Sequence, residues 1–419
     1  MKTNKSYGTI FYSLINITYF MAFCTVHAFA AVYLLDKGFS NMIVGVLLAV
    51  ANVASALLQP LVASLIDKYV KITNRGVSII SALIITAGSV ILLFTGSNKA
   101  VVFIIFTIMY MTQFTYMPVL TALSFEYQKK GVNIFFGLAR GLGSAGFAVT
   151  SMFMGTIVEI HGTSRLLYAT IIATLVHALM LFLFKAPSPE VESVKADDAS
   201  NNADGNLAAN TDYDLTGSTG SGSEGAAPLS LAGFFKTYPV FIILLVATTL
   251  LFFTHNMLND YLIQIVRNVG GSESDLGYAT FLSAILELPT MAVVSAVSKK
   301  VNMKRLLILA GVFFSLKSIV MMFATSMALV YISQSMQLLA YAVFIPASAY
   351  YVSENISLND QVKGQALITS CFTLSGVFSS LICGAILDSL GVGAMLITGA
   401  AVSILGTITI IAAMIKKQK

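Results

Sequence analysis

Long runs of apolar residues constrain what this chain can fold into more than any other feature of its sequence. Many of these runs reach roughly 18 residues, the length that an α-helix needs to cross a lipid bilayer. Hydrophobic residues make up 57% of the chain and charged residues only 10%, whereas a soluble domain carries about 25% charged residues. Because so few charges could not cover a water-facing surface, the sequence predicts an integral membrane protein.

The apolar runs divide into twelve predicted spanning helices, so the expected fold class is an all-α membrane protein. The predicted spans are 8–34, 41–65, 77–96, 99–126, 134–159, 165–185, 238–264, 275–298, 304–323, 326–352, 362–387 and 390–414.

Basic residues alternate between the loops in the way that this number of helices requires. Nearly all Lys and Arg residues fall near the two ends of the chain or in every second loop. The remaining loops hold only Lys37, Lys99, Arg165 and Arg267. Because cytoplasmic loops are the ones enriched in Lys and Arg, we expect a multi-pass protein of the cell membrane with both termini in the cytoplasm.

A polar stretch separates the first six helices from the last six. Residues 186–235 are acidic and rich in Gly and Ser, and such a composition buries too little apolar surface to fold. We therefore expect two six-helix halves, 1–185 and 236–419, joined by a flexible cytoplasmic linker.

The two halves share a pattern that indicates an internal duplication. Gly155 and Glu159 near the end of the fifth helix match Gly384 and Asp388 near the end of the eleventh. Halves related in this way are expected in transporters built from parallel repeats.

The loop after the second predicted helix carries a recognisable motif. The stretch QPLVASLIDKYVK, which begins at Gln59, resembles the G-x-x-x-D-[RK]-x-G-[RK] loop signature of the major facilitator superfamily. Asp67, Lys68 and Lys71 match the signature, and the resemblance implies that they form the conformational loop motif of that family.

The start of the fifth helix carries a second resemblance. The segment FGLARGLGSAGFA, which begins at Phe136, is similar to the same helix in the lactose permease-like oligosaccharide:proton symporters. The segments GGSES, from Gly270, and LELP, from Leu286, resemble permeases near the nucleoside:proton symporters. These resemblances imply the major facilitator fold, a sugar or nucleoside as substrate, and a substrate-binding role for Arg140.

Several positions depart from the oligosaccharide symporters. Phe147 stands where their fifth helix has a sugar-stacking Trp, and Gln334, Gln337 and Ala340 stand where their tenth helix has Lys, His and Glu. Lactose is therefore not the expected substrate, and the proton relay of that family cannot be transferred to this chain.

Ionisable side chains at bilayer depth are costly and mark functional sites. Glu287 and Lys317 occupy matching depths in adjacent antiparallel helices, and Asp260 lies in the seventh helix. We expect Glu287 and Lys317 to form an ion pair whose separation changes the proton affinity of the carboxylate, with Asp260 as a further proton-coupling residue. A static pair that orders helix packing is the alternative.

Arg140 lies on one face of the fifth helix with Ser144 and Phe147. Its guanidinium presents a rigid fork of donors that suits hydroxyl groups or a carboxylate. We expect these three residues to bind substrate, although an ion pair between Arg140 and Glu126 is an alternative.

Four other helices carry faces that mix amide and aromatic side chains. The candidate substrate-binding residues on these faces are Asn16, Phe20, Phe23, Tyr110, Gln113, Asn256, Asn259, Gln334 and Gln337. Such groups line small-solute sites, but each face alone is also consistent with contacts between helices.

The sequence contains no P-loop, no nucleophile elbow and no metal-binding spacing of Cys and His. We therefore expect no enzymatic activity, no cofactor and no metal, and a monomer whose partners are a small solute, protons and the bilayer but not nucleic acid. The favoured function is proton-coupled symport of a small polar solute, such as a sugar or nucleoside, by alternating access. Proton-driven efflux of drugs or metabolites and a non-transporting membrane sensor remain as alternatives.

Overall fold

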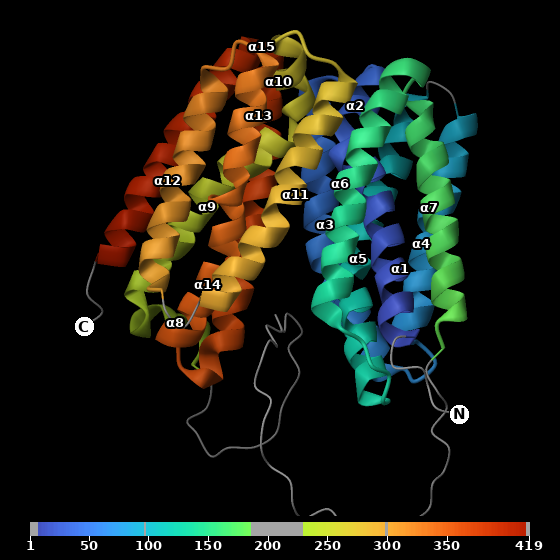
Figure 1. The fold of residues 1–419 in the computed structure, drawn as a ribbon, viewed down its shortest axis with the longest axis horizontal. Helices are drawn as coiled ribbons and strands as arrows, with labels where there is room; N and C mark the ends of the chain where they lie inside the picture. Colours follow the sequence, from blue (N-terminus) through green and yellow to red (C-terminus); the bar gives the residue numbers. More distant parts are fainter. Residues whose placement is uncertain (1–6, 96–97, 186–228, 298–300, 416–419) are drawn as a thin grey trace, which may run out of the picture.

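The computed structural model describes residues 7–95, 98–185, 229–297 and 301–415. All regular structure in these residues is helical, as Figure 1 shows. Ser40, Thr73 and Asn98 begin three of the helices by accepting a hydrogen bond from a backbone N–H of the first turn, which satisfies a donor that the helix itself cannot pair.

The first half consists of six crossings. They are α1 (Tyr7–Phe23) continued by the π-helical turn η1 (Cys24–Ala28) and α2 (Ala30–Asp36), then α3 (Asn41–Lys68), α4 (Asn74–Phe94), α5 (Lys99–Lys129), α6 (Phe136–His161) and α7 (Ser164–Leu183).

The second half repeats this order after the short helix α8 (Leu231–Thr237). Its elements are α9 (Pro239–Asp260) continued by α10 (Leu262–Asn268), α11 (Glu273–Val297), α12 (Met303–Met322), α13 (Met327–Ser335) continued by the 3₁₀ turn η2 (Met336–Leu338) and α14 (Tyr341–Asn355), the turn η3 (Leu358–Asp360), and α15 (Gln361–Ile415).

The helix α15 comprises two crossings. A straight helix of its 55 residues would extend about 80 Å, far beyond a hydrocarbon core of about 30 Å. Gly391 interrupts it with φ of 81°, a left-handed conformation that favours glycine, and the chain reverses there.

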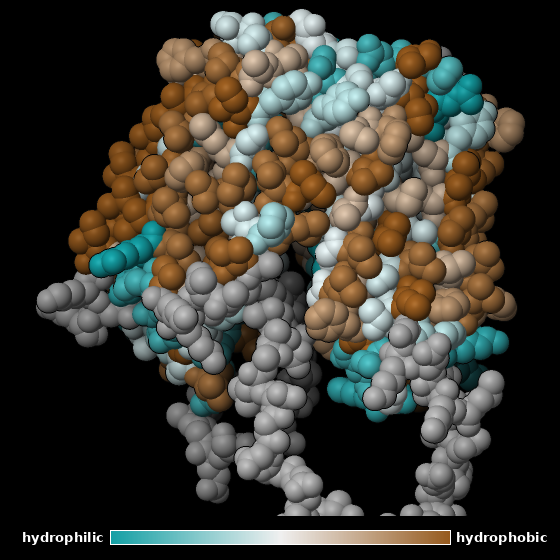
Figure 2. All heavy atoms as spheres, viewed as in Figure 1, coloured by the Kyte–Doolittle hydropathy of each residue, from teal (hydrophilic) through white to brown (hydrophobic). Residues whose placement is uncertain are grey.

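The predicted fold class is confirmed. Ten helical segments of the described chain are long and apolar enough to cross a membrane; α11 adds one crossing and Gly391 divides the last segment in two, which makes twelve. Each predicted span overlaps its observed helix to within a few residues. The outer surface of both halves is apolar (Figure 2), as contact with lipid requires.

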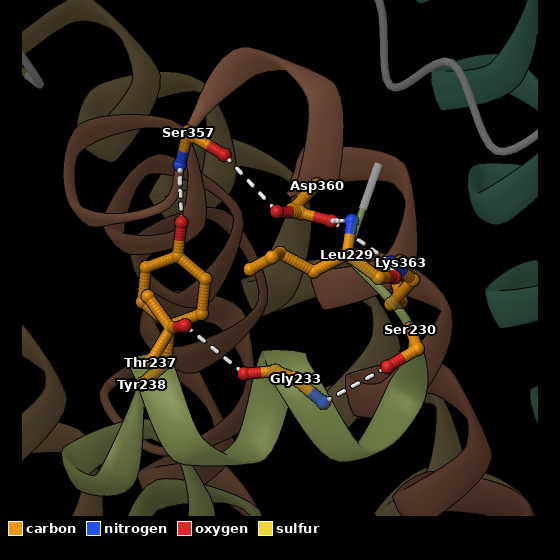
Figure 3. Close-up of polar contacts among 8 residues, drawn as sticks. All are labelled: Leu229, Ser230, Gly233, Thr237, Tyr238, Ser357, Asp360 and Lys363. Atoms are coloured by element: carbon orange, nitrogen blue, oxygen red, sulfur yellow. Dashed lines mark hydrogen bonds and ion pairs between the residues drawn. The ribbon is translucent and has the colours of Figure 1, made fainter. Parts of the chain in front are cut away.

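The predicted linker 186–235 differs from the structure at its second end. Residues 186–228 lie outside the described residues, whereas Leu229 and the residues after it contact the second half. The backbone N–H of Leu229 donates to Asp360, the Lys363 ammonium contacts the Leu229 carbonyl, and Ser230 caps α8 (Figure 3). The end of the predicted linker therefore packs against the second half, because η3 and the start of α15 bind the segment before α8.

The two halves are joined at the face opposite to Tyr7 and Ile415, which we term the far face. Asp388, at the end of the eleventh crossing, lies at the N-terminus of α3 in the other half. Its carboxylate accepts hydrogen bonds from the Asn41 backbone N–H at 3.0 Å, the Asn41 side-chain amide at 2.8 Å and the Met42 N–H at 2.7 Å. A carboxylate is stabilised there by free N–H groups and by the helix dipole.

Glu159 makes the equivalent contact in the opposite direction. It ends the fifth crossing and accepts hydrogen bonds at the N-terminus of α11, from the Ser272 hydroxyl at 2.8 Å and the Ser274 N–H at 3.2 Å. The matched positions of Glu159 and Asp388 in the sequence thus correspond to matched contacts in space, each between a carboxylate of one half and a helix N-terminus of the other. We term these two contacts the far-face latches.

Glycine allows the backbones of the two halves to touch beside the latches. A Cβ atom on Gly277 would lie 2.4 Å from the Ser151 carbonyl oxygen, and a Cβ on Gly384 would lie 2.6 Å from the Asn41 carbonyl oxygen. Neither contact leaves room for any side chain, so the helix pairs α6–α11 and α3–α15 seal the far face. Toward the opposite face, where the described chain begins and ends, a cleft separates the halves (Figure 2).

Removing the charge from both latches will shift the halves toward separation at the far face. We expect Asp388→Asn with Glu159→Gln to do so because hydrogen bonds to charged groups contribute about 1.5–3 kcal/mol each. Spin labels can be attached at Ile160 and Leu390, which are 67% and 71% exposed. Pulsed electron paramagnetic resonance should then show a larger population of long distances between the two labels.

Asp36→Asn is the matched control for this experiment. The Asp36 carboxylate accepts a hydrogen bond from Thr163 at 2.6 Å, so it lies at the same face but joins residues of one half only. An unchanged distance distribution in the double variant, or an equal shift in the control, would show that the latches do not hold the halves together.

Candidate functional site

Arg140 of α6 points toward α1 and has no carboxylate partner among the described residues. Its guanidinium donates to the Ser144 hydroxyl at 3.0 Å and lies 4.1 Å from the centre of the Phe20 ring, a favourable cation–π distance. Glu126, the alternative partner, binds Lys130 at 2.6 Å and Asn74 at 2.9 Å instead. The half-buried Arg140 therefore keeps donors that a ligand can use.

An aromatic cluster continues from Phe20 along α1. The Phe23 ring lies 5.9 Å from Phe20 and 6.3 Å from Phe147 of α6, and it stacks on His27 at 4.0 Å. Tyr110 of α5 lies 3.8 Å from His27. The predicted residues Phe20, Phe23, Phe147 and Tyr110 are thus brought together, and their rings offer flat apolar surfaces beside the Arg140 guanidinium.

His27 belongs to this cluster, although it was not among the predicted binding residues. Neither of its ring nitrogens has a hydrogen-bond partner in the described residues, and both are buried. It lies in the π-helical turn η1, and such turns are frequent at functional sites. The relevant sequence signal was its position on the same face of helix 1 as Asn16, Phe20 and Phe23.

Asn16 and Gln113 are the two remaining predicted residues of the first half. Asn16 is buried, donates to the Tyr12 carbonyl at 2.9 Å, and packs with Phe20 against Gly143 of α6. Gln113 is fully buried, and neither polar atom of its amide has a partner in the described chain. An unpaired buried amide is costly, so Gln113 is a group that a ligand or a water molecule would satisfy.

In the second half, the side chains of Lys317, Gln337 and Glu287 form one hydrogen-bonded chain. The Lys317 ammonium donates to the Gln337 amide oxygen at 2.6 Å, and the Gln337 amide nitrogen donates to the Glu287 carboxylate at 2.9 Å. The structure therefore differs from the expected ion pair, because an amide lies between the two charges. Sequence spacing could not show this, since the three residues come from α12, η2 and α11.

The tenth crossing is interrupted beside this chain, and α11 contains a proline there. Gln337 lies in η2, between the end of α13 at Ser335 and the start of α14 at Tyr341, where Ala340 has φ of −87° and ψ of −89°. In α11, Pro289 follows Glu287 by two residues and cannot donate the usual helical hydrogen bond.

Two asparagines of α9 have different surroundings. The Asn259 amide nitrogen lies 3.0 Å from His255 Nε2, and the His255 ring stacks on Tyr341 at 4.8 Å. Asn256 instead donates to Ser375 at 3.1 Å and to the Phe372 carbonyl at 3.3 Å, which are contacts with α15. Asn259 thus belongs to a polar and aromatic group next to the helix 10 break, whereas Asn256 joins two helices.

The other predicted residues lie apart from the Lys317–Gln337–Glu287 chain. Asp260, the last residue of α9, accepts a hydrogen bond from Ser380 at 3.0 Å. Gln334 is buried with both amide atoms unpaired in the described chain. The loop residues Asp67, Lys68 and Lys71 are exposed at the open end of the cleft. No cluster of metal-binding side chains occurs among the described residues.

Comparisons with known proteins identify a family and a fold. Residues 10–396 match the model of the MFS_1 like family. No curated protein matches the chain in sequence. The crystal structure of the nucleoside transporter NupG is similar with a TM-score of 0.75 and 12% identity, covering 98% of this chain and 100% of that one. A structure of a NupG point mutant is similar with a TM-score of 0.75 and 13% identity, covering 97% and 99%.

The packing of Asn16 and Phe20 on α6 can be tested at two neighbouring glycines. In Gly143→Ala the new Cβ would lie 2.7 Å from Phe20 Cδ2 and 3.1 Å from Asn16 Cβ, whereas nothing lies within 4 Å of a Cβ on Gly141. We expect Gly143→Ala to lower the melting temperature of the purified protein. Gly141→Ala should leave it equal or higher, because alanine favours a helix by about 0.5–1 kcal/mol over glycine. Equal melting temperatures would contradict this packing.

Proposed function

The chain belongs to the MFS_1 like family and is a multi-pass membrane transporter, and from this premise we propose that it imports a nucleoside or a closely similar polar solute together with protons. The observation that carries the proposal is the pairing of a ligand-accessible Arg140 beside aromatic rings in one half with a Lys317–Gln337–Glu287 chain in the other.

The chemistry of the first-half cluster supports a nucleoside as substrate. A nucleobase presents a flat π-face that stacks on aromatic side chains, and the half-buried rings of Phe23 and Phe147 offer such surfaces, while Tyr110 is buried against His27. Ribose hydroxyls are acceptors that suit the Arg140 guanidinium. NupG, which shares the fold, is described as a nucleoside transporter. A sugar would use the same hydroxyl-binding groups but fewer of the aromatic faces.

Glu287 is the group that we propose to carry the proton. Its half-buried carboxylate is linked to the buried Lys317 only through the Gln337 amide. An ionised carboxylate at bilayer depth is costly unless its surroundings compensate it, so a change in these contacts would change its proton affinity. Asp260 is a second candidate, and its contact with Ser380 would respond to movement between α9 and α15.

Alternating access is supported by the arrangement of the halves. The far-face latches and glycine contacts close one end, while the cleft is open at the other. We propose that residues 1–185 and 236–419 rock about the site as two units, with Asp67, Lys68 and Lys71 contacting the other half when the cleft closes. The alternation of basic loops supports an orientation in the cell membrane with the cleft facing the cytoplasm, and we propose that the protein works there as a monomer.

The test of this function combines binding and uptake. We expect uridine or thymidine to raise the melting temperature of the purified protein more than lactose does, because a ligand that binds only the folded state stabilises it. In vesicles, an inward proton gradient should drive accumulation of the same nucleoside. Thermal stabilisation by none of these solutes, or uptake that ignores the gradient, would contradict the proposal.

Replacing Glu287 will separate exchange from uphill transport. In Glu287→Gln no proton can be carried, so we expect accumulation in vesicles to fall to the equilibrium level while exchange across equal pH continues. Glu354→Gln is the matched control, since Glu354 is exposed at the end of α14. Retained accumulation in Glu287→Gln would remove Glu287 from the coupling step.

Replacing Arg140 will weaken substrate binding. Arg140→Lys keeps the charge but loses the planar fork, and a lost hydrogen bond to a charged group costs about 1.5–3 kcal/mol, so we expect KM for uridine uptake to rise about tenfold or more. Arg305→Lys, at an exposed position in α12, should leave KM unchanged. An unaltered KM in Arg140→Lys would exclude this arginine from the binding site.

A further inference from the structure

We propose that Gln337 couples the charge on Glu287 to the conformation of the break in helix 10, as a positioning residue rather than a substrate ligand. This inference rests on the proposed proton-coupled transport and assigns the element that responds to the proton. The amide oxygen of Gln337 contacts a positive group, and its amide nitrogen contacts a negative one.

The orientation of the amide is set by those charges. Its oxygen faces the Lys317 ammonium at 2.6 Å, and its nitrogen faces the Glu287 carboxylate at 2.9 Å. Gln337 is 3% exposed and Lys317 is 1% exposed, so neither is free to exchange its partner for bulk water. One N–H and one oxygen lone pair of the Gln337 amide are therefore used by the two charged groups, and its second N–H and second lone pair have no partner among the described residues.

The backbone that carries Gln337 is not held by a regular helix. The tenth crossing passes from α13 through η2 and a turn into α14, whereas its counterpart in the first half, α5, runs unbroken from Lys99 to Lys129. The duplicated fold therefore does not require a break at this place. Of these two equivalent crossings, the interrupted one lies in the half that contains the Lys317–Gln337–Glu287 chain.

Protonation of Glu287 changes the force on this break. A proton from water in the cleft forms an O–H bond on the carboxylate, which becomes a neutral carboxylic acid, and the same O–H bond breaks when the proton leaves to the other side. While the acid is neutral, the Gln337 amide nitrogen loses a charge-assisted hydrogen bond, and such bonds are roughly twice as strong as neutral ones. The interaction that holds η2 against α11 is then weaker.

Other charged or titratable groups around Glu287 act on it from three elements. Lys317 faces it from α12, Arg140 from α6 in the other half, and Tyr341 from the start of α14. Lys317 and Arg140 favour the ionised carboxylate. Among the described residues, however, Gln337 alone both hydrogen-bonds to Glu287 through its side chain and lies within the break itself.

The test uses Gln337→Met, which keeps the length of the side chain but removes both polar atoms. Uridine exchange at equal pH and proton-driven uridine accumulation are measured in vesicles across a range of pH. We expect exchange to stay within about threefold of the unmodified protein, while accumulation falls at least about tenfold and exchange loses its pH dependence. Equal losses of exchange and accumulation, with a higher KM, would mean that Gln337 binds substrate and would overturn the proposal.

A double-substitution cycle with Glu287→Gln keeps the test valid if Gln337→Met is less stable. If Gln337 acts only through Glu287, adding Gln337→Met to Glu287→Gln will change the pH profile no further, because two groups on one path are not additive. A further additive change would overturn the proposal.

Gln334→Met is the matched control. Gln334 is a buried glutamine of the same crossing, one turn before the break, with no partner in the described chain. We expect it to leave the pH profile in place, whatever its effect on KM. If Gln334→Met also abolishes the pH dependence, any substitution in this part of helix 10 has that effect, and the specific role proposed for Gln337 is wrong. Absence of any uridine uptake or exchange by the unmodified protein would instead reject the proposed nucleoside transport itself.

Discussion

The amide of Gln337 joins a buried ammonium and a carboxylate in one hydrogen-bonded chain, and the proposed coupling depends on this contact. Charges at bilayer depth need partners inside the protein because lipid supplies none. A direct ion pair between Lys317 and Glu287 would satisfy each charge more completely and would leave less reason for the carboxylate to take up a proton. With an amide between them, both charges have a hydrogen-bond partner, and the half-buried carboxylate accepts one hydrogen bond from the described residues, which its protonation would alter.

The interruptions of the helices follow from the same requirement. A regular helix pairs the backbone groups of its interior within itself, so its backbone is less free to respond to a side chain than an interrupted one. The protein departs from regular helix at η1 beside the aromatic cluster, at the junction of α9 and α10 after Asp260, and at η2 beside Gln337. Each interruption lies next to a residue that the proposed function uses. Irregular backbone at membrane depth is tolerated where protein or a water-filled space surrounds it, and the cleft between the halves provides such a space.

The far-face latches hold one of the two arrangements that the proposed alternating access requires. Glu159 and Asp388 bind the N-termini of helices in the opposite half, and glycines let those helices touch. Both contacts would break together if the halves separated at that face, because each joins one half to the other. The two carboxylates therefore oppose opening at the far face, while the Lys317–Gln337–Glu287 chain lies deeper, within one half. We infer that substrate and proton must together offset the loss of the latches.

The sequence by itself determined the membrane class, the twelve crossings, the duplication and the kinds of residue at the site. These depend on properties that can be read along the chain, namely the length of apolar runs, the alternation of charged loops and the matching positions of Glu159 and Asp388 in the two halves. The sequence could also place Arg140, Ser144 and Phe147 on one face, since positions four and three residues apart share a helix face. Only the tertiary structure decided that Gln337 lies between Lys317 and Glu287, that Arg140 contacts Phe20 rather than Glu126, and that Asn256 faces α15. Those outcomes depend on how each helix is rotated and where it breaks, which packing between distant segments sets and which spacing along one helix cannot reveal.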